Sequence, residues 1–196
     1  MDVVGRDLAV LQDAGVDGLL FCNEADLPYQ LAVGPEIPAA MAAVIGELRP
    51  EVRVPFGVNI LWDARASLAL ARATGAVFIR EVLTGVYESD LGMIAPDIGN
   101  IAAYRDAIGA GDVALFDNIS PEFASAIGRR GIADRARGAA FLGRRRDPDQ
   151  RARGRGAVRD ERPDRGQGGG AGRRRRRQHR RPRRHDRRTS SRSPTR

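Results

Sequence analysis

Hydrophobic residues recur along most of the chain in one order: a stretch with helical spacing, then a glycine, then a short apolar run. In the first instance Val4, Leu8 and Leu11 share one face of a predicted helix, which ends at Gly15 before an apolar run at 18–22. Spacings of three and four residues are typical of amphipathic helices, whereas short continuous apolar runs are typical of buried strands. The pattern therefore predicts a helix followed by a strand.

Three further units repeat this order. Asp63 is expected to be the N-cap of one of their helices, and Pro55 must lie near the start of a strand because it cannot donate a ladder hydrogen bond. Apolar strands that alternate with helices indicate the α/β class and a parallel sheet covered by helices. The predicted helices are residues 37–48, 64–74 and 98–108, and the strands after them are residues 52–60, 77–80 and 113–116.

Four such units predict a partial (β/α)8 TIM barrel, since a complete barrel needs about 250 residues. A doubly wound open sheet is the competing architecture, but no G-x-G-x-x-G turn follows the first strand, which disfavours a dinucleotide-binding version of it. A barrel is expected to open on a strand, whereas this sequence opens on a helix. We therefore expect a fragment that lacks the front of its barrel.

Charge changes abruptly after Gly143. Residues 1–143 contain 11 Arg against 19 Asp and Glu, a net of −8, whereas residues 144–196 contain 22 Arg against 6 acidic residues, a net of +16. The second segment has no Leu, Ile, Met, Phe, Trp, Tyr or Cys, so it cannot bury enough apolar surface to offset the entropy of ordering. We expect a partial TIM-barrel domain at 1–143 and a disordered Arg/Gly-rich tail at 144–196.

The Arg-rich tail has two interpretations. A basic arm could bind nucleic acid through counterion release, and nucleic acid is an expected partner only if the tail is genuine. The preferred interpretation is a frameshift near Gly143, because Arg codons of the form CGN, read one base later, encode Val, Ala, Asp or Gly. In that frame residues 144–155 can encode Ala-Asp-Ala-Ile-Leu-Thr-Ser-Gly-Pro-Gly. The chain also contains no Lys, which fits GC-rich codons better than selection for phosphate binding.

Cysteine use and hydropathy exclude several classes of protein. Cys22 is the single cysteine and cannot form a disulfide within the chain, which indicates a reducing compartment. The N-terminus has no signal-peptide pattern, and no stretch approaches the roughly 18 apolar residues of a membrane span. We expect a soluble, cytoplasmic protein with no integral membrane segment, and a homo-oligomer stays open.

Polar residues follow each predicted strand. The carboxyl ends of parallel strands meet at one edge, where α/β proteins place their chemistry. An acid-rich mouth with a single Arg suits a polar ligand, a divalent cation that bridges substrate oxygens, or both. The residues expected at this edge are Asn23, Glu24, Asp26, Asn59, Asp63, Arg80, Glu81, Glu88 and Asp90.

Some of these residues, and several of their neighbours, also have a structural interpretation. Arg80 and Glu81 could form an ion pair, and Trp62 is expected to serve packing rather than ligand stacking. Cys22 is expected to be a small core residue, because no His lies in residues 1–143 to activate it. Ser120 followed by Pro121 resembles a helix start.

No motif in the sequence identifies a reaction. Both His residues lie in the tail, and there is no His/Cys metal-ligand spacing, no phosphate-binding Walker sequence and no G-x-S-x-G elbow. General acid–base catalysis would therefore depend on carboxylates or on Tyr87. The catalytic residues and any cofactor stay unassigned, and no metal site is predicted.

Five short motifs occur in a fixed order: D-G, strand, N-E-x-D-x-P-Y at 17–29; G-V-N-x-L-x-D at 57–63; F-I-R at 78–80; T-G followed by D-x-G at 84–92; and Y-R at 104–105. Across roughly residues 10–143 the chain resembles the BtpA/SgcQ family. The resemblance implies a TIM barrel related to the ribulose-phosphate-binding barrels. That family includes proteins described as biogenesis factors for photosystem I and others of unassigned enzymatic role beside sugar-metabolism genes.

The resemblance implies that the intact parent protein binds or transforms a small phosphorylated metabolite at the carboxyl ends of the strands, whereas this chain by itself is expected to be inactive. A non-catalytic assembly factor for a membrane complex is the alternative. The family's opening strand, of the type G-x-H-x-x-P-x-P-G, is absent here, and the phosphate site is expected in a second half of the barrel. The ligand-binding candidates are Asn23, Glu24, Asp26, Asn59, Asp63, Arg80, Thr84 and Asp90.

Overall fold

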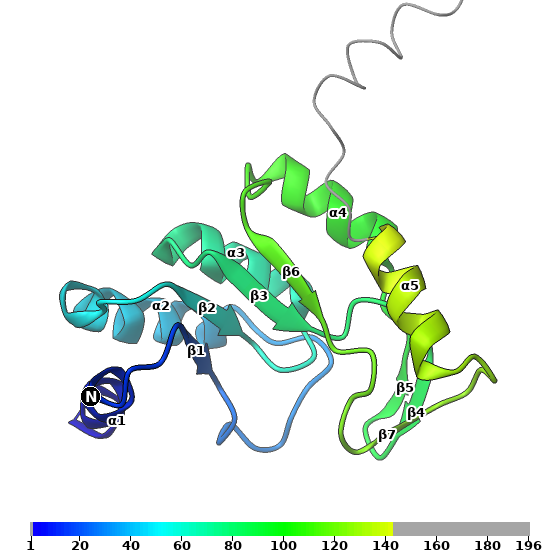
Figure 1. Ribbon diagram of the computed structural model, residues 1–196, viewed down its shortest axis with the longest axis horizontal. Coiled ribbons are helices and arrows are strands. Elements are labelled where there is room, and N and C mark those ends of the chain that lie inside the picture. Colours follow the sequence, from blue (N-terminus) through cyan, green and yellow to red (C-terminus); the bar gives the residue numbers. More distant parts are fainter. Residues whose placement is uncertain (1, 143–196) are drawn as a thin grey trace, which may run out of the picture. The chain divides into compact units, whose positions relative to one another are not determined.

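The computed structural model describes residues 2–142, which form helices and short strands (Figure 1). The expected disordered tail at 144–196 lies outside the described residues. The elements are α1 (Asp2–Asp13), β1 (Leu19–Cys22), α2 (Glu36–Leu48), a 3-10 turn (Arg49–Glu51), β2 (Phe56–Asn59), α3 (Ala64–Thr74), β3 (Phe78–Glu81), β4 (Tyr87–Ser89), β5 (Gly92–Ile94), α4 (Ile98–Ala107), β6 (Ala114–Asp117), β7 (Ala124–Ala126) and α5 (Ile132–Leu142).

Four of the strands form the parallel sheet that the sequence predicts. They pair in the order β1-β2-β3-β6, and every pairing is parallel. A doubly wound sheet reverses its strand order partway, whereas these strands follow the order of the chain. The described part is thus α/β, with the strand order that consecutive units of a barrel have.

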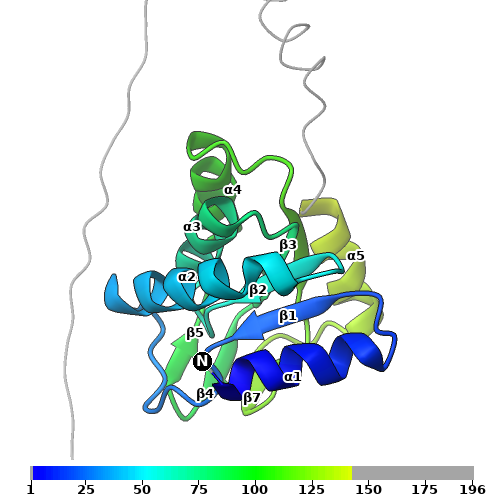
Figure 2. The same cartoon turned by 90° about the vertical axis from the view of Figure 1, so that its left-hand side faces the viewer.

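One face of this sheet packs against helices. Val58 and Ile79 are fully buried on it, next to Phe56. In the helix layer α2 packs against α3, and α3 packs against α4 (Figure 2). An ion pair of 2.7 Å between Asp13 and Arg53 joins the C-terminal end of α1 to the segment before β2. The main core therefore lies between the helices and one face of the sheet.

The opposite face of the sheet, which we call the open face, carries Leu20, Phe78, Arg80 and Phe116. The strand register and the alternation of side chains place these residues on the same side. Leu20 is 41% exposed and Phe116 is 54% exposed, and the Phe116 ring stacks on Phe78 with 4.7 Å between ring centroids. Within residues 2–142 the two faces of the sheet thus differ sharply in burial.

Local capping signals set the boundaries of α3 as expected. The Asp63 side chain accepts a hydrogen bond of 2.9 Å from the Ala66 amide, so the N-cap interpretation is confirmed. Gly75 follows the helix with a φ of 78°, a left-handed conformation that costs glycine little. The preceding strand β2 begins only at Phe56, because Pro50 lies in a 3-10 turn and Pro55 directly precedes the strand.

Part of the polar segment after β3 is a β-hairpin, which the sequence pattern does not predict. Strands β4 and β5 pair antiparallel, and β4 also pairs with β7, which follows β6. Tyr87 is 1% exposed and packs with Val82, Ile94 and the ring of Trp62. The segments after β3 and after β6 therefore join in a second, three-stranded sheet (Figure 1).

The prediction of a helix that begins at Pro121 is wrong. Residues 124–126 form β7 instead, where they pair with β4 and pack Ala124 and Ala126 against Tyr87. This pairing supplies hydrogen bonds to the same backbone groups that a helix would have used. The helix of this region, α5, begins only at Ile132.

Among the helices of residues 2–142, none has the length and apolar character needed to cross a membrane.

Candidate functional site

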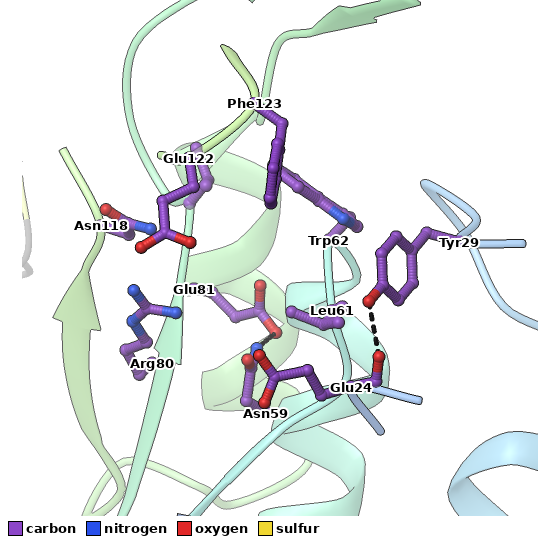
Figure 3. A pocket seen from close by; sticks show the side chains of 11 residues that line it. Glu24, Tyr29, Asn59, Leu61, Trp62, Arg80, Glu81, Asn118, Glu122 and Phe123 are labelled. Atoms are coloured by element: carbon purple, nitrogen blue, oxygen red, sulfur yellow. Dashed lines mark hydrogen bonds between the residues drawn. The ribbon is translucent and has the colours of Figure 1, made fainter. Parts of the chain in front are cut away.

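A pocket, which we call the rim pocket, opens at the carboxyl ends of the parallel strands (Figure 3). Its cavity volume is about 90 Å³, and the pocket is open to solvent at its mouth. This is the edge at which both barrels and open α/β sheets bind their ligands. The lining residues are Glu24, Tyr29, Asn59, Leu61, Trp62, Arg80, Glu81, Val82, Asn118, Glu122 and Phe123.

Glu81, at the end of β3, is the centre of a buried hydrogen-bond network on the floor of the rim pocket. The Asn59 side-chain amide donates to Glu81 Oε1 at 2.5 Å, and the Ser67 hydroxyl donates to the same oxygen at 2.7 Å. Ser67 also accepts a hydrogen bond of 2.7 Å from the amide of Ile60. Strands β2 and β3 and helix α3 thus meet at one carboxyl group.

Burial changes the acidity of Glu81, whose side chain is 4% exposed. Loss of solvation raises its pKa from 4.5 to about 7, while the hydrogen bonds from Ser67 and Asn59 act in the opposite direction. The charge of Asp63 raises the pKa further, and that of Arg80 lowers it. Glu81 therefore gains or loses a proton near neutral pH.

Arg80 and Glu81 do not form the ion pair that was one interpretation of their adjacency. Successive residues of a strand point to opposite faces, and the partners of Glu81 are Asn59 and Ser67. With the amide of Asn118 turned so that its oxygen faces the guanidinium, it accepts a hydrogen bond of 3.2 Å from Arg80 Nη2. Arg80 is thereby held at the side of the rim pocket.

Aromatic side chains form the outer wall of the rim pocket. Tyr29 donates a hydrogen bond of 2.5 Å to the Glu24 carbonyl, and Trp62 and Phe123 also line the pocket (Figure 3). Trp62 has a φ of 72° and Phe123 a φ of 58°, conformations that are strained for bulky residues. Trp62 packs against the cluster of Val82, Tyr87 and Ile94 and also lines the pocket, so the choice between packing and ligand stacking stays a prediction.

Three of the predicted ligand-binding residues meet in the rim pocket: Glu24, Asn59 and Arg80. Asn23 instead accepts a hydrogen bond of 2.9 Å from the Leu61 amide, which fixes the turn after β2. Asp26 is exposed and accepts a hydrogen bond of 3.4 Å from the Asn23 side chain.

The other three predicted residues have positions outside the pocket lining. Asp63 caps α3 and also accepts a hydrogen bond of 3.1 Å from the Val33 amide. Thr84 donates to Asp117 at 2.6 Å, and this contact ties the segment after β3 to the end of β6. Asp90 is exposed in the turn between β4 and β5. Ligand binding by these residues stays a prediction.

Metal-ligand clusters and the state of the single thiol can be checked in the described residues. Within residues 2–142 no three His, Cys, Asp or Glu side chains are arranged to hold a metal ion. Burial, together with the charges of Glu24 and Glu81, raises the pKa of the Cys22 thiol to about 11. The thiol donates a hydrogen bond of 3.3 Å to Asn59, so Cys22 supports the floor of the pocket rather than acting as a nucleophile.

Several residues that line the rim pocket are not among the ligand-binding candidates that the sequence indicated. Glu81 is among the residues expected at the strand ends, with an ion pair to Arg80 as the alternative, but it lies outside the motifs that carry the family resemblance. Asn118 directly follows β6, and that position was a signal for the site. Tyr29, Glu122 and Phe123 lie in loops whose course depends on contacts distant in sequence, so no local pattern indicated them.

Known proteins are similar in sequence to the part of the chain that forms the fold and the rim pocket. The model of the BtpA family matches residues 1–146. A protein of the sgc region, SgcQ, from Escherichia coli (strain K12) is 48% identical over 141 residues, which are 72% of this chain and 53% of SgcQ. The photosystem I biogenesis protein BtpA from Synechocystis is 34% identical over 126 residues, or 63% of this chain and 44% of that protein.

The chain thus spans about half the length of these relatives, by the shares of 53% and 44%. No solved structure matches. The family match includes every parallel strand and every side chain of the rim pocket. On that match the chain belongs to the BtpA family.

Proposed function

We propose that the described residues are about half of a (β/α)8 barrel that binds a small polar metabolite in the rim pocket. The observation that carries the proposal is the meeting of Glu24, Asn59, Arg80 and Glu81 at the carboxyl ends of adjacent parallel strands. Side chains that hydrogen-bond to hydroxyl and carbonyl groups converge there beside an aromatic wall. Such a combination is typical of small-molecule sites.

The open face supports the barrel. In a closed barrel this face points inward, and side chains from the remaining strands fill the interior. Leu20, Phe78 and Phe116 are apolar residues of the kind that such an interior requires. Further strands beside β1 and β6 would cover them.

The ligand is proposed to carry a phosphoryl group that binds outside the rim pocket. Arg80 is the cation in the lining, and three carboxyl groups, those of Glu24, Glu81 and Glu122, share the lining with it. A phosphate dianion would be repelled by these carboxylates where they are ionised. The rim pocket therefore suits the carbon chain and its oxygens, and the phosphoryl group fits a part of the rim beyond these strands.

Thermal-shift measurements on the full chain test the proposal. Sugar phosphates of three to six carbons and their unphosphorylated parents are the probes, and binding is expected to raise the melting temperature. Arg80→Met and Glu24→Gln are expected to abolish the shift, whereas Arg72→Met and Glu47→Gln, which alter exposed residues of α3 and α2, retain it. Shifts that survive both pocket variants would refute the assignment.

A non-catalytic assembly factor for a membrane complex, of the photosystem I type, is the second candidate. The exposed apolar residues of α1 favour it, since Val3 is 60% and Val10 68% exposed, away from the rim pocket. The relative from Synechocystis is named a photosystem I biogenesis protein. Replacing Val3 and Val10 by Ser would then abolish association with a purified membrane complex, whereas Arg80→Met would leave the association intact.

A further inference from the structure

The two oxygens of the Glu81 carboxyl group have different surroundings. Both hydrogen bonds that it accepts, from Asn59 and from Ser67, end on Oε1. The other oxygen points away from Asn59 and into the rim pocket (Figure 3). Glu81 is thus fixed through one oxygen and presents the second to whatever occupies the pocket.

Charged and titratable groups surround Glu81 from each neighbouring element. Asp63 lies at the start of α3, Arg80 precedes Glu81 on β3, and Cys22 ends β1. Asp117 is its register partner on β6, but that carboxylate accepts hydrogen bonds from the Leu83 amide at 2.8 Å and from Thr84. Arg80 is the cationic residue that directly precedes Glu81 in the sequence, and it lines the same pocket.

We propose that Glu81 is the proton-transfer residue of the rim pocket and acts through Oε2 on a carbon next to a carbonyl group of the ligand. This inference rests on the proposed function, because it requires a ligand in the same pocket. A buried carboxyl group that exchanges its proton near neutral pH is suited to general acid–base work. Asn59 and Ser67 position the group and do not react.

The step conserves atoms and charge. The ionised Glu81 carboxylate takes the proton, the electron pair of the broken C–H bond forms a C=C bond, and the carbonyl oxygen becomes an enolate oxygen. Arg80 stabilises the negative charge that develops on that oxygen. Glu81 then returns the proton, from the same face, to the former carbonyl carbon, while the hydroxyl proton on the neighbouring carbon passes to the enolate oxygen and that neighbouring carbon becomes the new carbonyl. The reaction class is therefore isomerisation between a hydroxy ketone and a hydroxy aldehyde.

Exchange of ligand hydrogen for deuterium tests this step without knowledge of the product. The full chain is incubated in D2O with dihydroxyacetone phosphate or dihydroxyacetone, and proton NMR follows both the loss of the C–H signal and the line broadening that reports binding. Glu81→Gln is expected to slow exchange by at least about 100-fold, whereas Glu47→Gln leaves it unchanged. The rate is expected to rise with pH as Glu81 ionises and to level off above about pH 7.

The outcomes separate the two proposals. Binding without exchange, exchange that is unchanged in Glu81→Gln, or a rate that is flat from acid to alkaline pH each overturns the role of Glu81 and leaves the binding pocket standing. No binding of either probe overturns the proposed ligand class and the role of Glu81 together. The pH profile of the unaltered protein decides the matter even if Glu81→Gln fails to fold.

Discussion

The buried carboxyl group of Glu81 predicts a specific pH dependence of stability. Its pKa is about 7 in the folded protein against 4.5 without burial, so the folded state keeps this proton to higher pH than the unfolded state does. The stabilisation is complete below about pH 4.5 and is lost as the pH rises through about 7. Because each pKa unit corresponds to about 1.4 kcal/mol, the free energy of unfolding is expected to fall by about 3 kcal/mol over that interval.

The measurement is the difference in unfolding free energy between the unaltered chain and Glu81→Gln, taken from urea transitions between pH 4.5 and 8.5. Gln keeps an acceptor for Asn59 and Ser67 but cannot ionise, so the difference isolates this group from the other acidic residues. Glu47→Gln, at an exposed position of α2, is the matched control and is expected to show no pH-dependent difference. A difference for Glu81→Gln that stays constant with pH would refute the reasoning.

Three further predictions follow. Leu68→Ala, at a fully buried position of α3, is expected to lower the unfolding free energy by about 2–5 kcal/mol, whereas Leu11→Ala, at a side chain 46% exposed, changes it by less than about 0.5 kcal/mol in the same urea titration. Gly57→Ala would place a Cβ 2.2 Å from the ring of Phe78, so we expect a lower melting temperature and a displaced ring, measurable from the aromatic NMR signals. Sequencing the DNA across the codon of Gly143 is expected to show an inserted or deleted base, and an intact frame would restore the interpretation of the tail as a basic arm.

Local signals predicted the helices and parallel strands well. Asp63 and Gly75 mark the ends of α3 because the capping oxygen and the left-handed glycine act within a few residues of the helix. The alternation of helices with apolar strands likewise indicated a parallel sheet, since it reflects which faces are buried. The strand predicted at 52–60 begins later in the structure, at Phe56, because Pro50 and Pro55 interrupt the backbone before β2.

Contacts distant in sequence account for what the pattern did not reveal. The pairing of Tyr87 with Ala126 forms a sheet from two segments that look like loops when each is considered alone. The same pairing replaced the helix expected at Pro121. The role of Glu81 depended on which face of β3 it occupies, and only the register with β2 and the contact with Ser67 on α3 settled that.

The alternation of Arg80 and Glu81 on β3 has a consequence for how this site can vary. One residue presents a cation at the side of the pocket and the next presents an acid at its floor, so the two functions depend on the number of residues between Gly75 and the end of the strand. Deleting one residue in that interval would exchange the faces of all that follow, placing the cation against Ser67 and the acid on the open face. The site is thus specified by a chain length as much as by residue identity.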